Sequence, residues 1–391
     1  MKKLKLVDYY ILIPYLVLSF FGIVMVYSSS ANVALSTGTT AGAYLIKQTA
    51  YVIVGLVLAF GFYYLKLSVL RSGRIVEYMT FGIFFLVVTV LIVGSRVNGA
   101  KGWINLGPIN IQPEEFLKLF IVLFLAHYMD SHQQALSERF WTTMWQPLLM
   151  LLVLMLLIFI QPDTGGFVID GFIVLIMILA SGNRRGLPMT IVGGLFLLYV
   201  GMLVTLSHID VTHSFLAHSY QLQRFVAFAD PFGTVKTVGR QLVNSYYAIS
   251  NGGLFGVGLG NSIQKMGYLP EPNTDFILAV TSEELGVVTV LGVLFFLGML
   301  AFRAVRLGNR ATTMYESLVC YGIAALLTVQ SLFNVGGVIG ALPITGVTLP
   351  FVSYGGSSML VLASCMGILM NISAREKRER QAVLNVKLAA N

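Results

Sequence analysis

The sequence predicts an all-α polytopic membrane protein of about ten transmembrane helices, with a large extracytoplasmic loop between helices 7 and 8. The chain of 391 residues is 57% hydrophobic and only 11% charged. Apolar windows of about 17 to 25 residues, each able to cross a hydrocarbon layer of about 30 Å, recur from end to end. Runs such as residues 148–160 are too continuously apolar for outer-membrane barrel strands. We therefore expect one integral membrane domain covering residues 1–391.

Ten segments have the length and composition of a membrane span. They cover about residues 9–29, 47–65, 75–94, 114–129, 147–161, 166–182, 188–206, 277–302, 314–335 and 351–372. Short loops rich in Lys and Arg stay in the cytoplasm, and an inside amino terminus places most of the 25 basic residues there. Both termini are therefore expected in the cytoplasm, with the basic tail 373–391 inside and the loop 207–276 outside.

The net charge of +8 does not point to nucleic acid. The basic residues are spread over short loops and a tail at the membrane boundaries, where attraction to anionic headgroups accounts for them. No nucleic-acid partner is predicted.

The outer loop, residues 207–276, is the one long stretch that lipid cannot bury. It carries aromatic residues, and apolar residues at helical spacing around 242–249, so we expect short helices against the outer membrane face. Long ordered loops of this kind are usually functional. Its end brings Asp275 to the start of a span, followed closely by Glu283 and Glu284.

The fourth span opens with charged residues at membrane depth, where they are costly and usually serve a site. Glu114 and Glu115 lie four and three residues before Lys118, the spacing of ion pairs on one helix face. Two interpretations stay open: an ion pair that lets the helix enter the membrane, or a substrate-facing group. Asp163 at the membrane edge fits either a tight turn or a site, whereas Asp170 is expected to hydrogen-bond a neighbouring helix.

The segment 341–358 combines Pro, Gly and hydroxyl residues and makes a poor continuous helix. Such a broken segment is tolerated at membrane depth only where it faces protein or a polar cavity. Ser357 is one of the hydroxyl groups that would line such a cavity.

These residues carry a resemblance to a known family. The chain resembles the SEDS family of FtsW, RodA and SpoVE over about residues 9–372, and is more similar to FtsW than to RodA. The motifs are Asn98-Gly-Ala-Lys-Gly-Trp-Ile104, Gln112-Pro-Glu-Glu, Gln161-Pro-Asp, the Gly-rich stretch 252–260, Leu269-Pro-Glu-Pro-Asn-Thr-Asp-Phe276, Glu283-Glu-Leu-Gly and Leu349-Pro-Phe-Val-Ser-Tyr-Gly-Gly-Ser-Ser358.

The resemblance implies a peptidoglycan glycosyltransferase in the bacterial cytoplasmic membrane. It would polymerise lipid II at the outer face during septal division or elongation, beside a class B penicillin-binding protein (the transpeptidase) and other division or elongation membrane proteins. A precursor flippase and a non-catalytic division scaffold are the alternatives. A flippase needs charged groups through both leaflets, whereas the acids here cluster outside, which favours chemistry.

Polymerisation needs a base for the attacking sugar hydroxyl, and Asp275 suits that role. Cations must hold the departing pyrophosphate, and Lys118 and Arg224 are the best candidates. Lys101 stands one position before the site where the family has Arg, and Glu115 matches the family's acid. Glu284 and Ser357 complete the predicted substrate contacts. A divalent cation, magnesium or manganese, is a candidate cofactor that would bridge pyrophosphate to Asp275 or Glu284.

Overall fold

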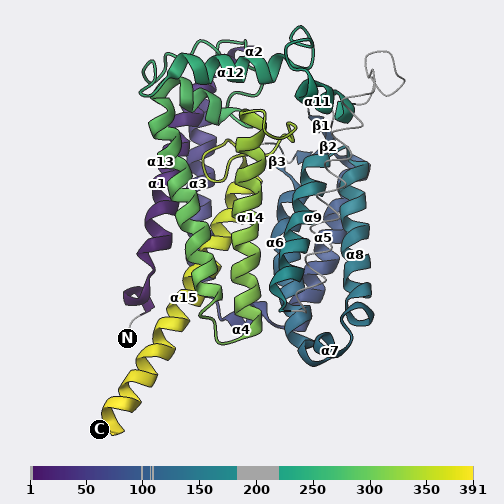
Figure 1. The fold of residues 1–391 in the computed structure, drawn as a ribbon, viewed down its shortest axis with the longest axis vertical. Helices are drawn as coiled ribbons and strands as arrows, with labels where there is room; N and C mark the ends of the chain where they lie inside the picture. The colour runs from purple at the N-terminus through teal and green to yellow at the C-terminus, as the bar shows by residue number, and fades with distance from the viewer. Residues whose placement is uncertain (1–2, 98–99, 106, 108–109, 183–219, 391) are drawn as a thin grey trace.

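The computed structural model describes residues 3–97, 100–105, 107, 110–182 and 220–390. Long helices run side by side, shorter helices lie across one end of them, and the two termini lie at the other end (Figure 1). The long helices are α1 (Tyr9–Ser29), α3 (Ala41–Tyr64), α5 (Gly73–Val93), α6 (Pro113–Ser131), α8 (Phe140–Ile160), α9 (Thr164–Ala180), α13 (Ile277–Gly308), α14 (Met314–Val338) and α15 (Gly356–Ala390). The shorter ones are η1 (Lys3–Leu6), α2 (Ala31–Ser36), α4 (Leu67–Leu70), α7 (Gln133–Glu138), α11 (Tyr220–Ala229) and α12 (Arg240–Gly252).

These helices confirm the polytopic prediction. Nine predicted spans each coincide with a long helix, while the span 188–206 and loop residues 207–219 lie outside the described residues. Within the described chain, seven helices are long and apolar enough to cross a membrane. The helix α9 is apolar but shorter, and α6 carries four charged residues. The chain is a multi-pass membrane protein.

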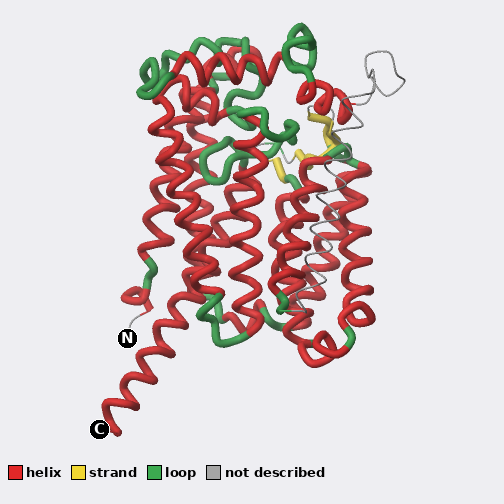
Figure 2. Tube along the Cα trace, viewed as in Figure 1, coloured by secondary structure: helices red, strands yellow, loops and turns green. Residues whose placement is uncertain are grey.

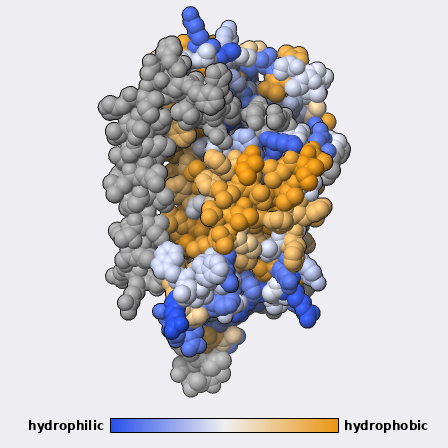
Figure 3. Space-filling model, turned by 90° about the vertical axis from the view of Figure 1, so that its right-hand side faces the viewer, coloured by the Kyte–Doolittle hydropathy of each residue, from blue (hydrophilic) through white to orange (hydrophobic). Residues whose placement is uncertain are grey.

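The surface has the polarity that a bilayer requires. On the face that Figure 3 shows, hydrophobic surface covers the middle of the molecule, with polar surface above and below it. Large apolar side chains such as Phe85 and Trp145 are exposed on α5 and α8, whereas an 18-residue window of α15 is 94% buried. The helix α15 packs against α3, α1 and α6, and forms the central element of the core.

Three short strands, which the all-α prediction omitted, lie between α5 and α6. Strands β1 (Ser95–Val97), β2 (Ala100–Asn105) and β3 (Asn110–Ile111) form an antiparallel sheet in the order β1-β2-β3. Ser95 pairs with Trp103, and Ile104 pairs with Ile111. Runs of two to six residues at the membrane edge are too short to show the period of two on which a strand prediction depends.

The helix α13 is broken at Gly286, whose φ of 79° and ψ of 171° are not helical. The break leaves backbone groups that the Gly-rich stretch after α12 satisfies. Val257 and Gly258 donate to the carbonyls of Glu283 and Glu284, and Val287 donates to that of Gly253. The Gly-rich stretch is therefore ordered, because its backbone pairs with the backbone of the broken helix α13.

The irregular segment between α14 and α15 confirms the predicted interruption of the last span. Figure 2 shows it as a loop beside the outer half of α14, below the helix α12 labelled in Figure 1. Leu349 and Val352 in this segment are buried, so the irregular backbone faces protein. The helix α15 begins only at Gly356 and continues to Ala390, so the predicted solvated tail is its last part.

Candidate active site

Asp275 lies in a tight loop that leads directly into α13. Glu271 adopts a left-handed conformation with φ of 52°, and its carbonyl accepts hydrogen bonds from the backbone amides of Thr274 and Phe276. The Thr274 hydroxyl also donates to the Glu271 carboxylate at 2.9 Å. Positive φ is uncommon for a non-glycine residue and clusters at functional sites. The loop is thus wound tightly around the predicted base.

Groups from α14 and the irregular segment hold this loop in place. Asn334 on α14 donates to the backbone carbonyl of Asp275 at 2.9 Å and to that of Val347 at 2.7 Å. The Ser353 hydroxyl donates to the carbonyl of Thr274 at 2.6 Å. Backbone position at Asp275 is therefore fixed, while its half-buried carboxylate is left for chemistry.

The charge around Asp275 suits a base at neutral pH. Desolvation and the negative charges of Glu271 and Asp163 together raise the pKa of Asp275 to about 7, and the Arg224 guanidinium opposes them. Arg224 lies beside Gly346, where an added Cβ would meet the guanidinium at 3.0 Å. Gly346 and Asp275 line the same small cavity. The structure thus brings the predicted base and one predicted cation together.

A second group, the α6 cluster, comprises Glu114, Glu115 and Lys118. The Lys118 ammonium lies 3.0 Å from the Glu114 carboxylate and 3.1 Å from that of Glu115, and all three side chains are buried. The Glu114 side chain has room because it faces Gly166. A Cβ atom added at Gly166 would lie 2.6 Å from the Glu114 carboxylate. The predicted ion pair is present, and Lys118 is held by protein carboxylates.

Asp170 and Asp163 on α9 extend this acidic environment. Asp170 is fully buried, and neither of its oxygens has a hydrogen-bond partner among the described residues. The expected bond from Asp170 to a neighbouring helix is therefore absent from that part of the chain. Asp163 caps α9 by accepting from the amide of Gly166 at 2.9 Å, and it acts electrostatically on both Asp275 and Asp170. Its charge thus influences both the predicted base and the acids near the α6 cluster.

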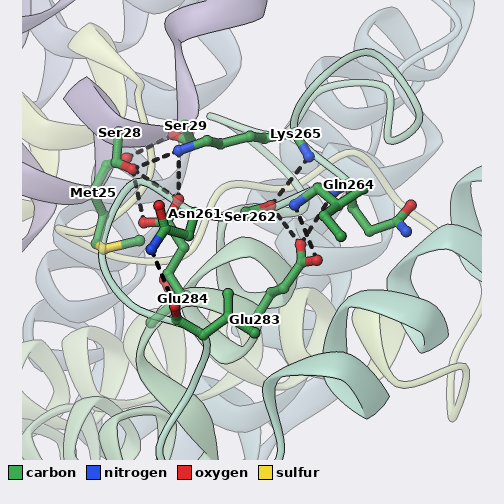
Figure 4. A network of polar contacts seen from close by, with 12 residues as sticks. Met25, Ser28, Ser29, Asn261, Ser262, Gln264, Lys265, Glu283 and Glu284 are labelled. Carbon is green, nitrogen blue, oxygen red and sulfur yellow. Dashed lines mark hydrogen bonds and ion pairs between the residues drawn. The ribbon is translucent and has the colours of Figure 1, made fainter.

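Glu284 does not join this site. It belongs to the α13 cluster of Glu283, Glu284, Lys265 and Ser28 (Figure 4). The Lys265 ammonium lies 2.6 Å from the Glu284 carboxylate, and the Ser28 hydroxyl of α1 donates to both its oxygens at 2.8 and 2.7 Å. Glu284 is completely buried and lies about 12 Å along α13 from the end of the Asp275 loop. The structure therefore separates the two carboxylates that were candidate ligands of one cation.

Glu283 organises the loop segment that precedes Asp275. Its carboxylate accepts from the amides of Ile263 and Gln264 at 3.1 and 3.2 Å, from Asn251 at 2.9 Å and from the Ser262 hydroxyl. Four donors saturate this buried acid. Together with the contact between Lys265 and Ser28, these hydrogen bonds hold the loop segment before Asp275 against α13 and α1.

Two further predicted contacts are occupied by structural hydrogen bonds. Lys101 on β2 donates to the carbonyls of Leu91 and Ile92 at 2.6 and 3.1 Å, where it caps the end of α5. The Ser357 hydroxyl accepts from the amide of Gln112 at 2.9 Å and joins the starts of α15 and α6. Both residues shape the outer end of the bundle, and neither lines the cavity at Asp275.

Sequence reasoning missed the contributions of Ser28, Lys265 and Asn334. Ser28 and Asn334 are ordinary polar residues inside apolar helices, and their partners lie 256 and 59 residues away. Lys265 was recognised only as a basic residue within the loop 207–276. Local spacing carries no signal for contacts at such separation. Polar residues at membrane depth were the available hint.

The fold and the site define a polytopic membrane protein with a half-buried carboxylate and a guanidinium beside the irregular segment between α14 and α15. The family model described as "Cell cycle protein", FTSW_RODA_SPOVE, matches residues 9–378. The chain belongs to this FtsW/RodA/SpoVE family, which confirms the sequence-based assignment.

Its relatives agree with the FtsW-like subtype. The chain is 38% identical to the probable peptidoglycan glycosyltransferase FtsW of Bacillus subtilis (strain 168), over 95% of this chain and 92% of that protein. Identity to the probable peptidoglycan glycosyltransferase FtsW of Lactococcus lactis subsp. lactis (strain IL1403) is also 38%, over 98% and 96%.

Solved structures share the fold. A chain from the study "Structural coordination of polymerization and crosslinking by a peptidoglycan synthase complex" matches with a TM-score of 0.72 at 26% identity, over 95% of this chain and 98% of that chain. The rod shape determining protein RodA of Thermus thermophilus matches with a TM-score of 0.66 at 25% identity, over 94% and 96%.

Proposed function

We propose that this chain is a peptidoglycan glycosyltransferase that polymerises lipid II into glycan strands, with Asp275 as its general base. The observation that carries the mechanism is the setting of Asp275, a half-buried carboxylate with a pKa near 7 beside Arg224. The curated names of its relatives support the reaction class.

In this reaction a sugar hydroxyl attacks an anomeric carbon that carries a lipid pyrophosphate. The new carbon–oxygen bond forms as the old one breaks, and its electron pair leaves with the pyrophosphate. Asp275 takes the hydroxyl proton. A base is most effective when its pKa lies near the working pH, which the burial of Asp275 achieves. Pyrophosphate is a good leaving group, so the site needs a cation more than a second acid.

Arg224 is the best-placed cation for that purpose. Its guanidinium lies beside Gly346, and Gly346 lines the cavity that also contains Asp275. Planar guanidinium groups bind phosphate oxygens through paired hydrogen bonds. Lys118 is already held by two carboxylates, so we assign it to positioning Glu115 and the inner wall of the site.

A divalent cation remains part of the proposal. Magnesium often binds one or two protein carboxylates and completes its coordination with substrate phosphate and water. Asp275 and its neighbour Glu271 offer such a set, and a bound cation would help to stabilise the charge of the departing pyrophosphate. Among the described residues, no group of three or more His, Cys, Asp or Glu side chains forms a metal site without substrate.

The orientation follows from the charge of the loops. We propose that both termini are cytoplasmic and that α11, α12 and the Asp275 loop face outside, at the end of the bundle opposite to the termini (Figure 1). A class B penicillin-binding protein is the proposed partner, supported by the structural match to a peptidoglycan synthase complex. Thiol labelling of Lys236→Cys in intact cells checks the orientation, and labelling only after permeabilisation would reverse it.

Incubation of the purified chain and its partner with purified lipid II tests the function. Glycan strands resolved on a gel are expected, and they should be lost with Asp275→Asn. Transfer of lipid II across liposomes without glycan, equally fast in Asp275→Asn, would instead establish the flippase.

A further inference from the structure

We infer that residues 253–258, called here the re-entrant tip, insert into the outer leaflet and contact lipid acyl chains. This surface is separate from the cavity at Asp275, and the inference does not depend on the proposed reaction. It rests on the depth of the tip, on the exposure of its side chains and on the lipid-facing helix surface beside it.

Two ion-paired contacts mark the thickness of the apolar layer. On α1, Asp8 accepts from Arg303 of α13 at 2.6 Å, and Ser28 donates to Glu284 of α13. Asp8 and Ser28 are 20 residues apart, which is about 30 Å along a helix. Arg303 and Glu284 of α13 contact the two ends of α1, so about the same distance separates them. The hydrocarbon core of a bilayer has this thickness, so Glu284 lies at its outer boundary.

The re-entrant tip extends below that boundary. The amide of Gly258 donates to the carbonyl of Glu284 at 2.9 Å, and the amide of Val288 donates to the carbonyl of Leu254 at 3.3 Å. Val288 lies in the unbroken part of α13, 15 residues or about 22 Å from Arg303, so it is about 7 Å inside the boundary at Glu284. Interfacial segments bury their apolar face by about 5–10 Å. The tip therefore reaches the upper acyl-chain region.

The break in α13 makes this depth possible for an irregular segment. Backbone groups in hydrocarbon must be paired within the protein. Gly286 interrupts α13, and the tip pairs with the groups that the interruption frees, through Gly253, Leu254, Val257 and Gly258. The helix break and the tip thus satisfy each other, as in re-entrant segments of other membrane proteins.

The side chains of the tip project outward and are apolar. Phe255 is 81% exposed and Leu254 is 64% exposed. Apolar surface of this kind marks a contact with lipid or with another protein. Beside it, α13 presents Val288, Leu291 and Phe295, whose spacing of three and four residues places them on one exposed helix face. The tip continues this lipid-facing surface, so we assign its occupant as acyl chains.

Spin labelling of the full chain in liposomes tests the inference. Cys320 and Cys365 are buried, so a nitroxide reagent labels an introduced thiol selectively. We expect the label on Phe255→Cys to collide readily with oxygen and rarely with a water-soluble nickel chelate, as a label on Leu291→Cys of the lipid-facing α13 does. Asn261→Cys, in the exposed part of the same loop, is the matched aqueous control and should show the reverse order.

Leu254→Cys provides a second label and should agree with Phe255→Cys. Strong collision of the two labels with the nickel chelate would place the tip in water and overturn the inference. Immobile labels that neither reagent reaches would show that a second copy of the chain covers the tip, and would overturn the lipid assignment. Since Phe255 packs little within the protein, its substitution is expected to leave the fold intact.

Discussion

The α6 cluster and the α13 cluster contain the same groups and differ in how completely those groups are satisfied. Each has two consecutive glutamates and one lysine, all buried. In the α13 cluster, Glu283 accepts from four donors and Glu284 from Ser28 and Lys265. In the α6 cluster one ammonium serves both carboxylates, and neither oxygen of the neighbouring Asp170 has a hydrogen-bond partner among the described residues.

The difference distinguishes a cluster whose hydrogen-bond acceptors all have partners from one near which some acceptors have none. Buried polar groups normally have partners, and each exception needs an explanation. The α13 cluster is complete within the protein and fixes the loop that leads to Asp275. The α6 cluster, with Asp170 and Asp163 nearby, retains acceptors that a substrate or water can occupy. Although the two clusters contain the same charged residues, we therefore expect them to differ in their sensitivity to substitution.

The largest effect is expected outside both clusters, at Asp275. Asp275→Asn keeps the shape but cannot accept a proton, so polymerisation of lipid II should fall by about 10² to 10⁴, the range for general-base catalysis. The loop should stay in place because Asn334 holds its backbone. Glycan formation on a gel measures the rate.

Asp230→Asn is the matched control, since Asp230 is an exposed carboxylate of the same outer loop. It should polymerise lipid II at the wild-type rate. Activity of Asp275→Asn within a few-fold of the wild type would reject the base.

Lys265→Ala tests the structural side of the comparison. Removing one partner of a buried ion pair costs about 3–5 kcal/mol, because the remaining charge is left without compensation. The free energy of unfolding in detergent should fall by that amount. Lys265→Met, which keeps the apolar stem, should be equally unstable if charge pairing matters and packing does not. A melting temperature like that of the wild type in both variants would show that the α13 cluster is dispensable.

Lys118→Ala tests the other cluster. If Lys118 positions Glu115 in the site, polymerisation should fall by about 10², the cost of misplacing a reacting group by about 1 Å. The loss of stability should be at least as large as in Lys265→Ala, because Lys118 pairs with two buried carboxylates and Lys265 with one. Both quantities are measured on the same purified samples. Unchanged turnover with a large loss of stability would make the α6 cluster structural as well.

The fold was largely predictable, because apolar runs of span length and the distribution of basic residues are properties of short windows. The ion pair of Glu115 and Lys118 was predictable for the same reason, since three residues set their spacing on a helix. Gly286 was not recognised as a break because the apolar pattern continues through it. Glu284 was predicted to bind substrate, and its contact with Ser28 was not foreseen because Ser28 comes 256 residues earlier.

Contacts between residues so far apart in the sequence form only when the whole chain folds. They determine which carboxylates remain available to a substrate. The motif around Asp275 predicted it as the base, but the half-buried setting of its carboxylate depends on α14 and the irregular segment. The seventh span and the first part of the outer loop, outside the described residues, stay predictions.

The smallest expected effect concerns the pH dependence of Asp275. Its pKa lies near 7, so below that pH the carboxyl is increasingly protonated and cannot act as a base. The polymerisation rate should therefore fall on the acidic side of about pH 7. Glu271 is a negative neighbour that raises this pKa. Glu271→Gln removes that charge, lowers the pKa of Asp275 and should move the acidic limb of the rate profile to lower pH.

The same profile distinguishes charge from structure at this position. Glu271→Gln keeps an oxygen that can accept from the Thr274 hydroxyl, so the loop is expected to hold its shape. At pH 6 the variant should retain a larger fraction of its maximal rate than the wild type does, while Asp230→Asn should superimpose on the wild type. An acidic limb unmoved by Glu271→Gln would mean that Asp275 does not set the pH dependence, because its ionisation must respond to the loss of a neighbouring charge.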